Sequence, residues 1–211
     1  MKPSKTKIRV LIADDHTIVR MGLVSLLGTE KDMEVVGQAK NGSEAVQTAL
    51  KTKPDVVIMD LVMPKMDGVE ATIELQKTLP SARILVLTTF GTSDGIAHAL
   101  ASGASGALIK SAENLDLITA IRQVAAGRRY LSPEIAEQLK LDPPVPELTP
   151  RQKDILALMI RGFTNRDIAN QLSLSTESVN EYVNAILQKV GAANRTEAVA
   201  IALRKHLLKS G

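Results

Sequence analysis

Over the first 127 positions, short unbroken runs of apolar residues alternate with longer segments in which apolar residues recur at helical spacing. Unbroken apolar runs are typical of strands that are covered on both faces, as in a parallel sheet. The runs that we predict as strands are Ile8–Ile12, Val35–Ala39, Val56–Met59, Ile84–Leu87 and the weaker Ala107–Ile109. The segments that we predict as helices are Ile18–Leu27, Ser43–Leu50, Val69–Leu79, Gly95–Ser102 and Leu115–Ala126. Five strand–helix units predict an α/β fold with a doubly wound, five-stranded parallel sheet.

The alternation ends at Gly127, and a proline-rich segment follows. Four prolines stand between positions 133 and 146, and the run Pro143–Pro146 cannot continue a helix. We interpret residues 128–146 as a linker with a short helix around Ile135–Leu139 and a semi-rigid end. This linker separates a domain at 1–127 from a second, smaller domain at 147–211.

The sequence of the second domain predicts helices only, because helix start signals recur along it. Thr149, a following proline and Gln152 form the pattern of a capping box with proline at the first helical position. Thr164 with Asp167 marks the next start, and Ser175 marks the one after it.

The helix that begins after Ser175 has one apolar face. Its apolar residues from Val179 to Val190 recur at i, i+4, i+7, i+8 and i+11, which predicts one buried stripe. A short helix at Asn165–Leu172 and a three-residue connector precede it, and this arrangement is the outline of a helix-turn-helix. The sequence therefore predicts a compact all-α helix-turn-helix unit.

The composition excludes several classes of site. The chain has no cysteine, which excludes disulfides, zinc–thiolate centres and thiol catalysis. No apolar run approaches the roughly 20 residues that span a bilayer, and the first apolar stretch is a poor secretory signal because it ends in two aspartates. We therefore expect no membrane association and a cytoplasmic location. Residues 147–211 carry nine Lys or Arg against six Asp or Glu, enough to permit nucleic-acid binding and too little to prove it.

Five polar residues stand where the predicted strands end: Asp14, Asp15, Asp60, Thr88 and Lys110. The carboxyl ends of parallel strands meet at one edge of the sheet, where such sheets bind ligands, so we expect these side chains to lie together. Three carboxylates repel one another unless a cation joins them, and oxygen ligands suit Mg²⁺. An aspartate beside Mg²⁺ can act as a nucleophile and form an aspartyl phosphate, with Lys110 and the Thr88 hydroxyl on the new oxygens.

Four motifs around these residues resemble the receiver domain of two-component response regulators, a flavodoxin-like fold. They are IADDH at 12–16, VVIMDLVMPKMDG at 56–68, ILVLTTF at 84–90 and GASGALIK at 103–110. The resemblance implies that Asp60 accepts a phosphoryl group from a sensor histidine kinase. It also implies that Asp14, Asp15, Asp60 and the backbone carbonyl of Val62 bind Mg²⁺. Thr88 matches the switch hydroxyl, and Lys110 matches the lysine that pairs with the phosphate.

The first domain departs from the receiver pattern at one position. The family carries an aromatic residue three positions before the lysine, and this chain has Ala107 there. The threonine–aromatic coupling of the family therefore cannot operate in its usual form. Thr88 still draws in the loop around Phe90–Asp94, or the switch is weaker, or Ala107 is simply a small strand residue that faces a helix.

Residues 147–209 resemble the DNA-binding domain of the LuxR/NarL class of response regulators, on the motifs LTPRQ, GFTNRDIA, LSLSTESV and KVGAANRTEAV. The resemblance implies that the phosphorylated chain dimerises and binds double-stranded DNA with the helix after Ser175 in the major groove. It also suggests the last helix, Thr196–Leu207, as a dimer contact, although the apolar face of that helix is equally compatible with core packing. The candidate DNA contacts are Thr164, Asn165, Arg166, Ser175, Thr176, Ser178, Asn180, Glu181, Asn184, Gln188 and Lys189, with Arg195 as a further backbone contact.

The second domain departs from its family where the family has a Thr-Val-Lys-x-His pattern. This chain reads Ser-Val-Asn-Glu-Tyr, so Asn180 replaces a lysine, Tyr182 replaces a histidine, and Glu181 adds a negative charge. Since each lost phosphate contact removes counterion release, we expect weaker and less salt-dependent non-specific binding.

Three functions are compatible with these observations. The leading hypothesis is a phosphorylation-controlled transcription regulator that is not an enzyme. The alternative is a phospho-regulated protein whose helical unit binds another protein, which the residues at 180–182 motivate. The third is a hydrolase of small phosphates, for which the sequence shows neither a substrate pocket nor an obvious general base.

Overall fold

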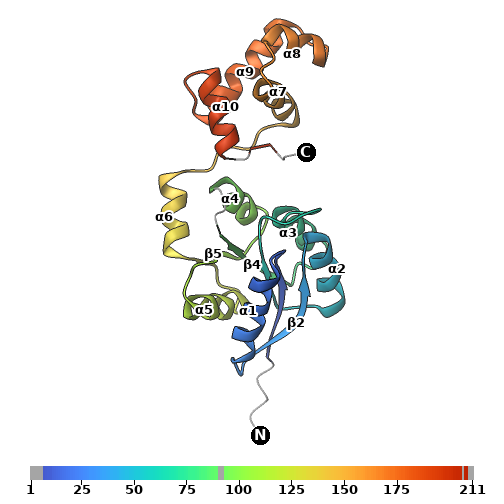
Figure 1. Cartoon of the computed structure of the whole chain (residues 1–211), viewed down its shortest axis with the longest axis vertical. Coiled ribbons are helices and arrows are strands. Elements are labelled where there is room, and N and C mark those ends of the chain that lie inside the picture. The colour runs from blue at the N-terminus through green and yellow to red at the C-terminus, as the bar shows by residue number, and fades with distance from the viewer. Residues whose placement is uncertain (1–6, 90–92, 206, 209–211) are drawn as a thin grey trace. The chain divides into compact units, whose positions relative to one another are not determined.

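The computed structural model describes residues 7–89, 93–205 and 207–208. The chain divides into two compact units, Met1–Asp142 and Pro143–Gly211 (Figure 1). The first unit contains the sheet, and the second contains only helices among its described residues.

The first unit is built on one parallel sheet with the strand order β2-β1-β3-β4-β5-β6. The strands are β1 (Ile8–Ala13), β2 (Met33–Ala39), β3 (Val56–Met59), β4 (Arg83–Thr88), β5 (Gly106–Ile109) and β6 (Tyr130–Leu131). The order reverses between β1 and β3, which creates a switch point at the carboxyl ends of these two strands. The doubly wound parallel sheet predicted from the sequence is confirmed, with one strand more than expected.

Helices cover both faces of the sheet (Figure 1). Leu11 and Met59 face a core that they share with α2 (Gly42–Thr52), α3 (Gly68–Thr78) and α4 (Ser93–Ala101). Ile12 and Ile58 face the opposite core, shared with α1 (Thr17–Gly28) and α5 (Asn114–Ala125). Alternate residues of one strand enter different cores because side chains of a strand point to opposite faces in turn. This two-sided burial explains why the strands read as unbroken apolar runs.

The segment 128–146, predicted as a linker, contributes its first part to the sheet unit. Gly127 has a φ of +78°, which glycine adopts readily and which turns the chain after α5. Tyr130 N then donates to Ser105 O at 3.2 Å, and Ser132 N donates to Ala107 O at 3.1 Å, so β6 pairs with β5. Ser132 caps α6 (Pro133–Leu141), the short helix expected around Ile135–Leu139.

The sequence pattern missed β6 because two residues carry no periodicity. Pro133 stands at the start of α6, where a missing N–H breaks no hydrogen bond. Ile135 is fully buried in the core that contains α3 and α4, so α6 is packed on the sheet unit.

The second unit contains α7 (Pro150–Ile160), α8 (Asn165–Leu172), α9 (Thr176–Val190) and α10 (Arg195–Arg204). The capping box predicted at Thr149 is present, and the helix start predicted at Thr164 is confirmed and is itself a capping box with Asp167. Ser175 caps α9 through the amide of Ser178. The four helices share one apolar core, to which α9 contributes its predicted stripe. No helix of the described residues is both long and apolar enough to cross a membrane.

The packing of α6 leads to a stability prediction. Ile135→Ala leaves a cavity in the core and should lower the free energy of unfolding by about 2–5 kcal/mol, measured by urea denaturation. Leu141→Ala is the matched control on the same helix, since Leu141 is 78% exposed, and should stay within ~0.5 kcal/mol of the wild type. Equal, small effects of both substitutions would show that α6 is not part of the core.

Candidate functional site

An acidic cluster lies at the switch point of the sheet. Asp14 and Asp15 follow β1, and Asp60 follows β3, its neighbour in the sheet. Asp14 is 2% exposed and Asp60 is 3% exposed, whereas the side chain of Asp15 is about a third exposed. The expectation that these carboxylates lie together follows from parallel pairing, and the structure places them so.

Lys110 bridges the two buried carboxylates. Its Nζ lies 2.7 Å from Asp14 Oδ2 and 2.6 Å from Asp60 Oδ2, and its side chain is 8% exposed. The backbone positions it, because Lys110 N donates to Thr88 O at 2.7 Å at the end of β4. Lys110 follows β5, which is separated from β3 by β4 in the sheet. Its side chain therefore extends past the end of β4 to reach Asp14 and Asp60.

Burial and pairing shift the protonation equilibria of this cluster. Burial raises the pKa of Asp60, and the hydrogen bond from Lys110 opposes that rise without cancelling it. Burial alone would lower the pKa of Lys110, but its hydrogen bonds to Asp14 and Asp60 raise the pKa overall. Lys110 therefore stays charged beside a carboxyl group whose ionised form is costly in the absence of further positive charge.

His16 adds an imidazole to the cluster. Its Nδ1 lies 2.7 Å from Asp15 Oδ1 and 3.3 Å from Asp14 Oδ1, and its amide donates to Asp14 Oδ1 at 2.8 Å. His16 is also the residue that precedes α1. Its contact with Asp15 depends on side-chain geometry, which the sequence pattern does not reveal.

The donor set fits a small divalent cation. One ligand atom from each of Asp14, Asp15, His16 and Asp60 lies within 4.8 Å of the others. The three carboxylates supply the oxygen ligands that Mg²⁺ prefers, at about 2.0–2.1 Å and with several waters kept. Val62 N donates weakly to Asp60 Oδ1 at 3.4 Å, so this residue lies beside the site, and its carbonyl stays a predicted ligand.

The backbone after Asp60 is held close to α3. A Cβ atom at Gly68 would lie 2.0 Å from Asp60 O, so a side chain at this position would push the Asp60 backbone away. Asp67 caps α3 in a capping box with Glu70, which fixes the helix start next to the site. The glycine of the motif MDG therefore allows α3 to begin close to the Asp60 backbone.

Thr88 and Ala107 lie on neighbouring strands. Thr88 ends β4 and is 1% exposed, and Ala107 pairs with Val86 in the sheet. Ala107 is fully buried in the core that contains Ile96 of α4 and Ile135 of α6. At the position where the family has an aromatic residue, this chain thus has a small strand residue that is covered by α4 and α6. Residues 90–92 of the loop that Thr88 was predicted to draw in lie outside the described residues.

In the second unit, α8 and α9 form a helix-turn-helix. Ser173 ends α8 in the left-handed conformation, and Ser175 begins α9 two residues later. The polar face of α9 is open to solvent, with Thr176, Asn180, Glu181, Asn184 and Gln188 exposed and Ser178 half-buried. Thr164 and Arg166 at the start of α8 are exposed, and Asn165 is half-buried.

Two of the predicted cationic DNA contacts are bound within the unit. Lys189 Nζ donates to Glu147 O at 2.8 Å and to Oε1 of the buried Gln152 at 3.0 Å. Arg195 donates to Asn165 and to the backbone carbonyl of Phe163. Arg166 thus remains as the exposed cation of the three.

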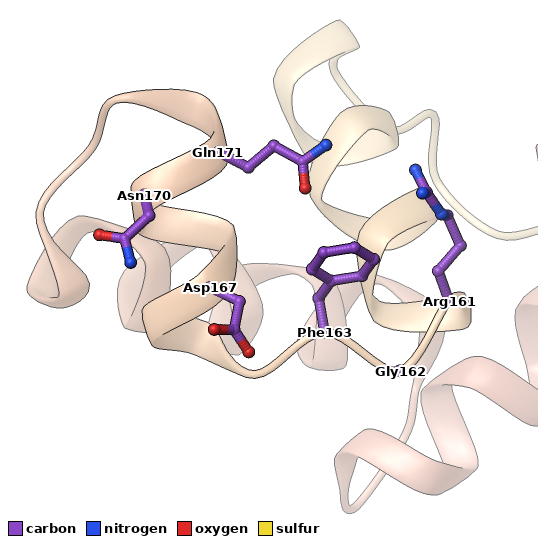
Figure 2. Close-up of a pocket in the computed structure, with 6 residues that line it drawn as sticks. All are labelled: Arg161, Gly162, Phe163, Asp167, Asn170 and Gln171. Atoms are coloured by element: carbon purple, nitrogen blue, oxygen red, sulfur yellow. The ribbon is translucent and has the colours of Figure 1, made fainter.

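A hollow that is open to solvent lies at the α7–α8 connection (Figure 2). The guanidinium of Arg161 lies 5.0 Å from the centroid of the Phe163 ring, within the range of a cation–π contact. Its lining residues are Arg161, Gly162, Phe163, Asp167, Asn170 and Gln171, none of which is a predicted DNA contact. The hollow nevertheless borders these contacts, since Thr164 Oγ1 donates to Asp167 Oδ2 at 2.6 Å.

Comparison with protein families matches both units. The family described as response regulator receiver domain matches residues 10–122, and the bacterial regulatory proteins of the luxR family match residues 146–202. A curated relative, response regulator protein VraR of Staphylococcus aureus strain Mu3, is 36% identical over 207 residues. That alignment covers 96% of this chain and 99% of VraR.

Solved structures show the same architecture. Response regulator ChrA, from a heme-sensing two-component system, is 35% identical with a TM-score of 0.57, over 96% of this chain and 99% of ChrA. A structure of two RcsB dimers bound to two parallel DNAs is 25% identical with a TM-score of 0.69, over 95% of this chain and 99% of RcsB. With both units matched and nearly the whole length aligned, this chain belongs to the two-component response regulators with a LuxR-type DNA-binding domain.

Proposed function

We propose that this chain is a transcription regulator whose DNA binding is controlled by phosphorylation of Asp60. A carboxylate oxygen of Asp60 attacks the phosphorus of a phosphohistidine on a sensor kinase. The phosphorus–nitrogen bond breaks, and the kinase histidine leaves as the acyl phosphate forms. The observation that carries the proposal is the buried Asp60 carboxylate, bridged by Lys110 to Asp14 at the ligand-binding edge of the sheet.

The charges around Asp60 suit a transferring phosphoryl group. Lys110 Nζ already lies 2.6 Å from Asp60 Oδ2, so it needs little movement to pair with oxygens bound there. The Thr88 hydroxyl is the second proposed donor to those oxygens. Bound Mg²⁺ would neutralise phosphoryl charge, and Asp14, Asp15, Asp60 and the Val62 carbonyl would hold it.

Exposed apolar side chains near the acidic cluster support a protein as phosphoryl donor. Ile18 in the first turn of α1 is 85% exposed, and Leu115 in the first turn of α5 is 75% exposed. Val62, two residues after Asp60, is 69% exposed. All three follow strand ends at the edge of the sheet that holds Asp60. If these side chains form one contiguous patch, that patch would suit contact with a protein donor.

The output in this proposal is binding of double-stranded DNA by a dimer. The polar face of α9 offers amide and hydroxyl groups to base edges in the major groove. Backbone amides at the starts of α8 and α9, near Thr164 and Ser175, are suited to phosphate contacts. The relative RcsB, solved as dimers on DNA, supports this choice over a protein-binding output.

The last helix offers a limited surface for dimerisation. Ala198 and Ala202 are buried in the core of the second unit, and Val199 is half-buried. Leu203 is 56% exposed and is the apolar side chain of α10 that we propose at a dimer contact.

Phosphorylation has a direct test. Wild-type protein incubated with acetyl phosphate and Mg²⁺ should gain the mass of one phosphoryl group, and replacement of Mg²⁺ by EDTA should suppress the gain. Asp60→Asn should show none, because the amide is not a nucleophile of this kind. Intact-mass spectrometry measures both.

Asp55→Asn is the matched control for this test. Asp55 precedes β3, at the opposite end of the strand from Asp60, and accepts a hydrogen bond from Arg9 N at 2.8 Å. That variant should be phosphorylated as the wild type is. An unchanged mass gain in Asp60→Asn would place the phosphoryl group elsewhere and contradict the proposal.

Substitutions of Arg166 and Lys189 should have different effects on DNA binding and on stability. Arg166→Met should weaken DNA binding and reduce the slope of log K against log salt by about one, as expected for one phosphate contact. Lys189→Met should leave that slope unchanged and lower the unfolding free energy by about 1–3 kcal/mol, because it removes two internal hydrogen bonds from a charged donor. Fluorescence anisotropy and urea denaturation measure the two effects. A lower slope with unchanged stability in Lys189→Met would show that Lys189 contacts DNA.

A further inference from the structure

We propose that Arg20 is a positioning residue for the metal site, because its guanidinium holds the backbone carbonyl that leads into Asp15 and so orients the Asp15 carboxylate. The inference rests on the proposed function, since it concerns the Mg²⁺ site beside Asp60. Arg20 does not itself bind the metal. It acts through the backbone between Asp14 and Asp15, two of the proposed ligands.

Arg20 joins α1 to the end of β1. Its Nη1 donates to Asp14 O at 2.7 Å, and its Nη2 donates to Thr17 Oγ1 at 3.2 Å. Thr17 and Arg20 stand three residues apart at the start of α1, so their side chains lie on one face of the helix. Arg20 is half-buried, and these two bonds hold its guanidinium between the helix and the strand end.

The start of α1 lacks a restraint that the next two helices have. Asn41 and Asp67 cap α2 and α3 through their side chains. His16 makes no such side-chain bond at the start of α1 within the described part of the chain. Since a cap helps to fix the path from strand to helix, the bond from Arg20 to Asp14 O supplies a tie at the point where α1 has no cap.

The Asp14 carbonyl belongs to the peptide plane that leads into Asp15. A peptide unit is planar, so a bond that holds its oxygen also restricts the direction in which the next residue begins. The Asp14 carboxylate is restrained independently, because Lys110 and the amide of His16 bind its two oxygens. The Asp15 carboxylate is about a third exposed and pairs with the exposed His16. Arg20 therefore acts on the carboxylate that has fewer other restraints.

Electrostatics and positioning predict opposite results for the loss of Arg20. Its guanidinium is bound beside a cluster of negative charges, so removal of its positive charge alone should strengthen the binding of Mg²⁺. Removal of a group that orients a metal ligand weakens metal binding, typically by about 10–100-fold. The sign of the change in Mg²⁺ affinity therefore distinguishes the two roles.

Mg²⁺ titration of the full-length chain tests the inference without phosphorylation, with the backbone amide shifts of residues 14–16 followed by NMR. Arg20→Met should raise the Mg²⁺ dissociation constant by about tenfold. Thr17→Val removes the second bond of Arg20 without a change of charge and should raise the constant by a smaller factor. Arg83→Met is the matched control, because Arg83 is an exposed arginine at the start of β4, at the opposite edge of the sheet from the acidic cluster. It should leave the constant unchanged.

The Mg²⁺ dependence of phosphorylation provides a second readout. With acetyl phosphate as donor, Arg20→Met should need about ten times as much Mg²⁺ for its half-maximal rate. Its rate at saturating Mg²⁺ should match that of the wild type, because Asp60 and Lys110 are unchanged. If the melting temperature shows that Arg20→Met is unfolded, Thr17→Val carries the test, since it keeps the arginine.

Three outcomes separate the inference from the proposed function. Equal or tighter Mg²⁺ binding in folded Arg20→Met, or in Thr17→Val where that variant alone is folded, would overturn the positioning role. A wild type that binds no Mg²⁺ would overturn the metal site and the positioning role together. Weaker Mg²⁺ binding in Arg20→Met, with no phosphorylation of the wild type, would support the positioning role and contradict the proposed function alone.

Discussion

The bridge from Lys110 to Asp14 and Asp60 is the interaction on which the proposed function of the first unit depends. Two carboxylates that are almost fully buried repel each other and disfavour ionisation, and the lysine between them offsets both effects. The bridge requires β1, β3 and the end of β5 to meet at one edge, which only the crossovers of a parallel sheet provide. The positive charge of one lysine does not balance the negative charges of three aspartates. The site can therefore accept a cation, and with it a phosphoryl group. The geometry thus favours a site that is completed by its ligands.

Much of this site follows from sequence pattern, because strand ends and parallel pairing determine it. Each predicted strand lies within an observed strand, so Asp14, Asp60 and Lys110 lie where the apolar runs indicate. Side-chain contacts are less accessible to such reasoning. The pairing of His16 with Asp15 depends on rotamers at the start of α1, and β6 is too short to show a period. The prolines around Ile135 are typical of a linker. Ile135 is nevertheless buried in the core of the sheet unit, and this contact packs α6 against that unit.

In the second unit too, the sequence pattern predicts the helices better than it predicts the side-chain contacts. Capping signals and the stripe of α9 predicted the helices well, since both are local properties of the chain. The roles of its cations were harder to predict, because charge alone does not distinguish a DNA contact from an internal donor. Lys189 and Arg195 satisfy buried or half-buried oxygens between helices, whereas Arg166 is exposed.

Phosphorylation of Asp60 is proposed to control DNA binding by the second unit. The most direct measurement is the affinity of the full chain for a duplex that carries its selected site, with and without acetyl phosphate and Mg²⁺, in the wild type and in Asp60→Asn. The account predicts that phosphorylation tightens wild-type binding by about tenfold or more, in the range of allosteric coupling between sites, and that Asp60→Asn does not respond. Equal affinity of the wild type in both states, with phosphorylation verified by mass, would contradict it.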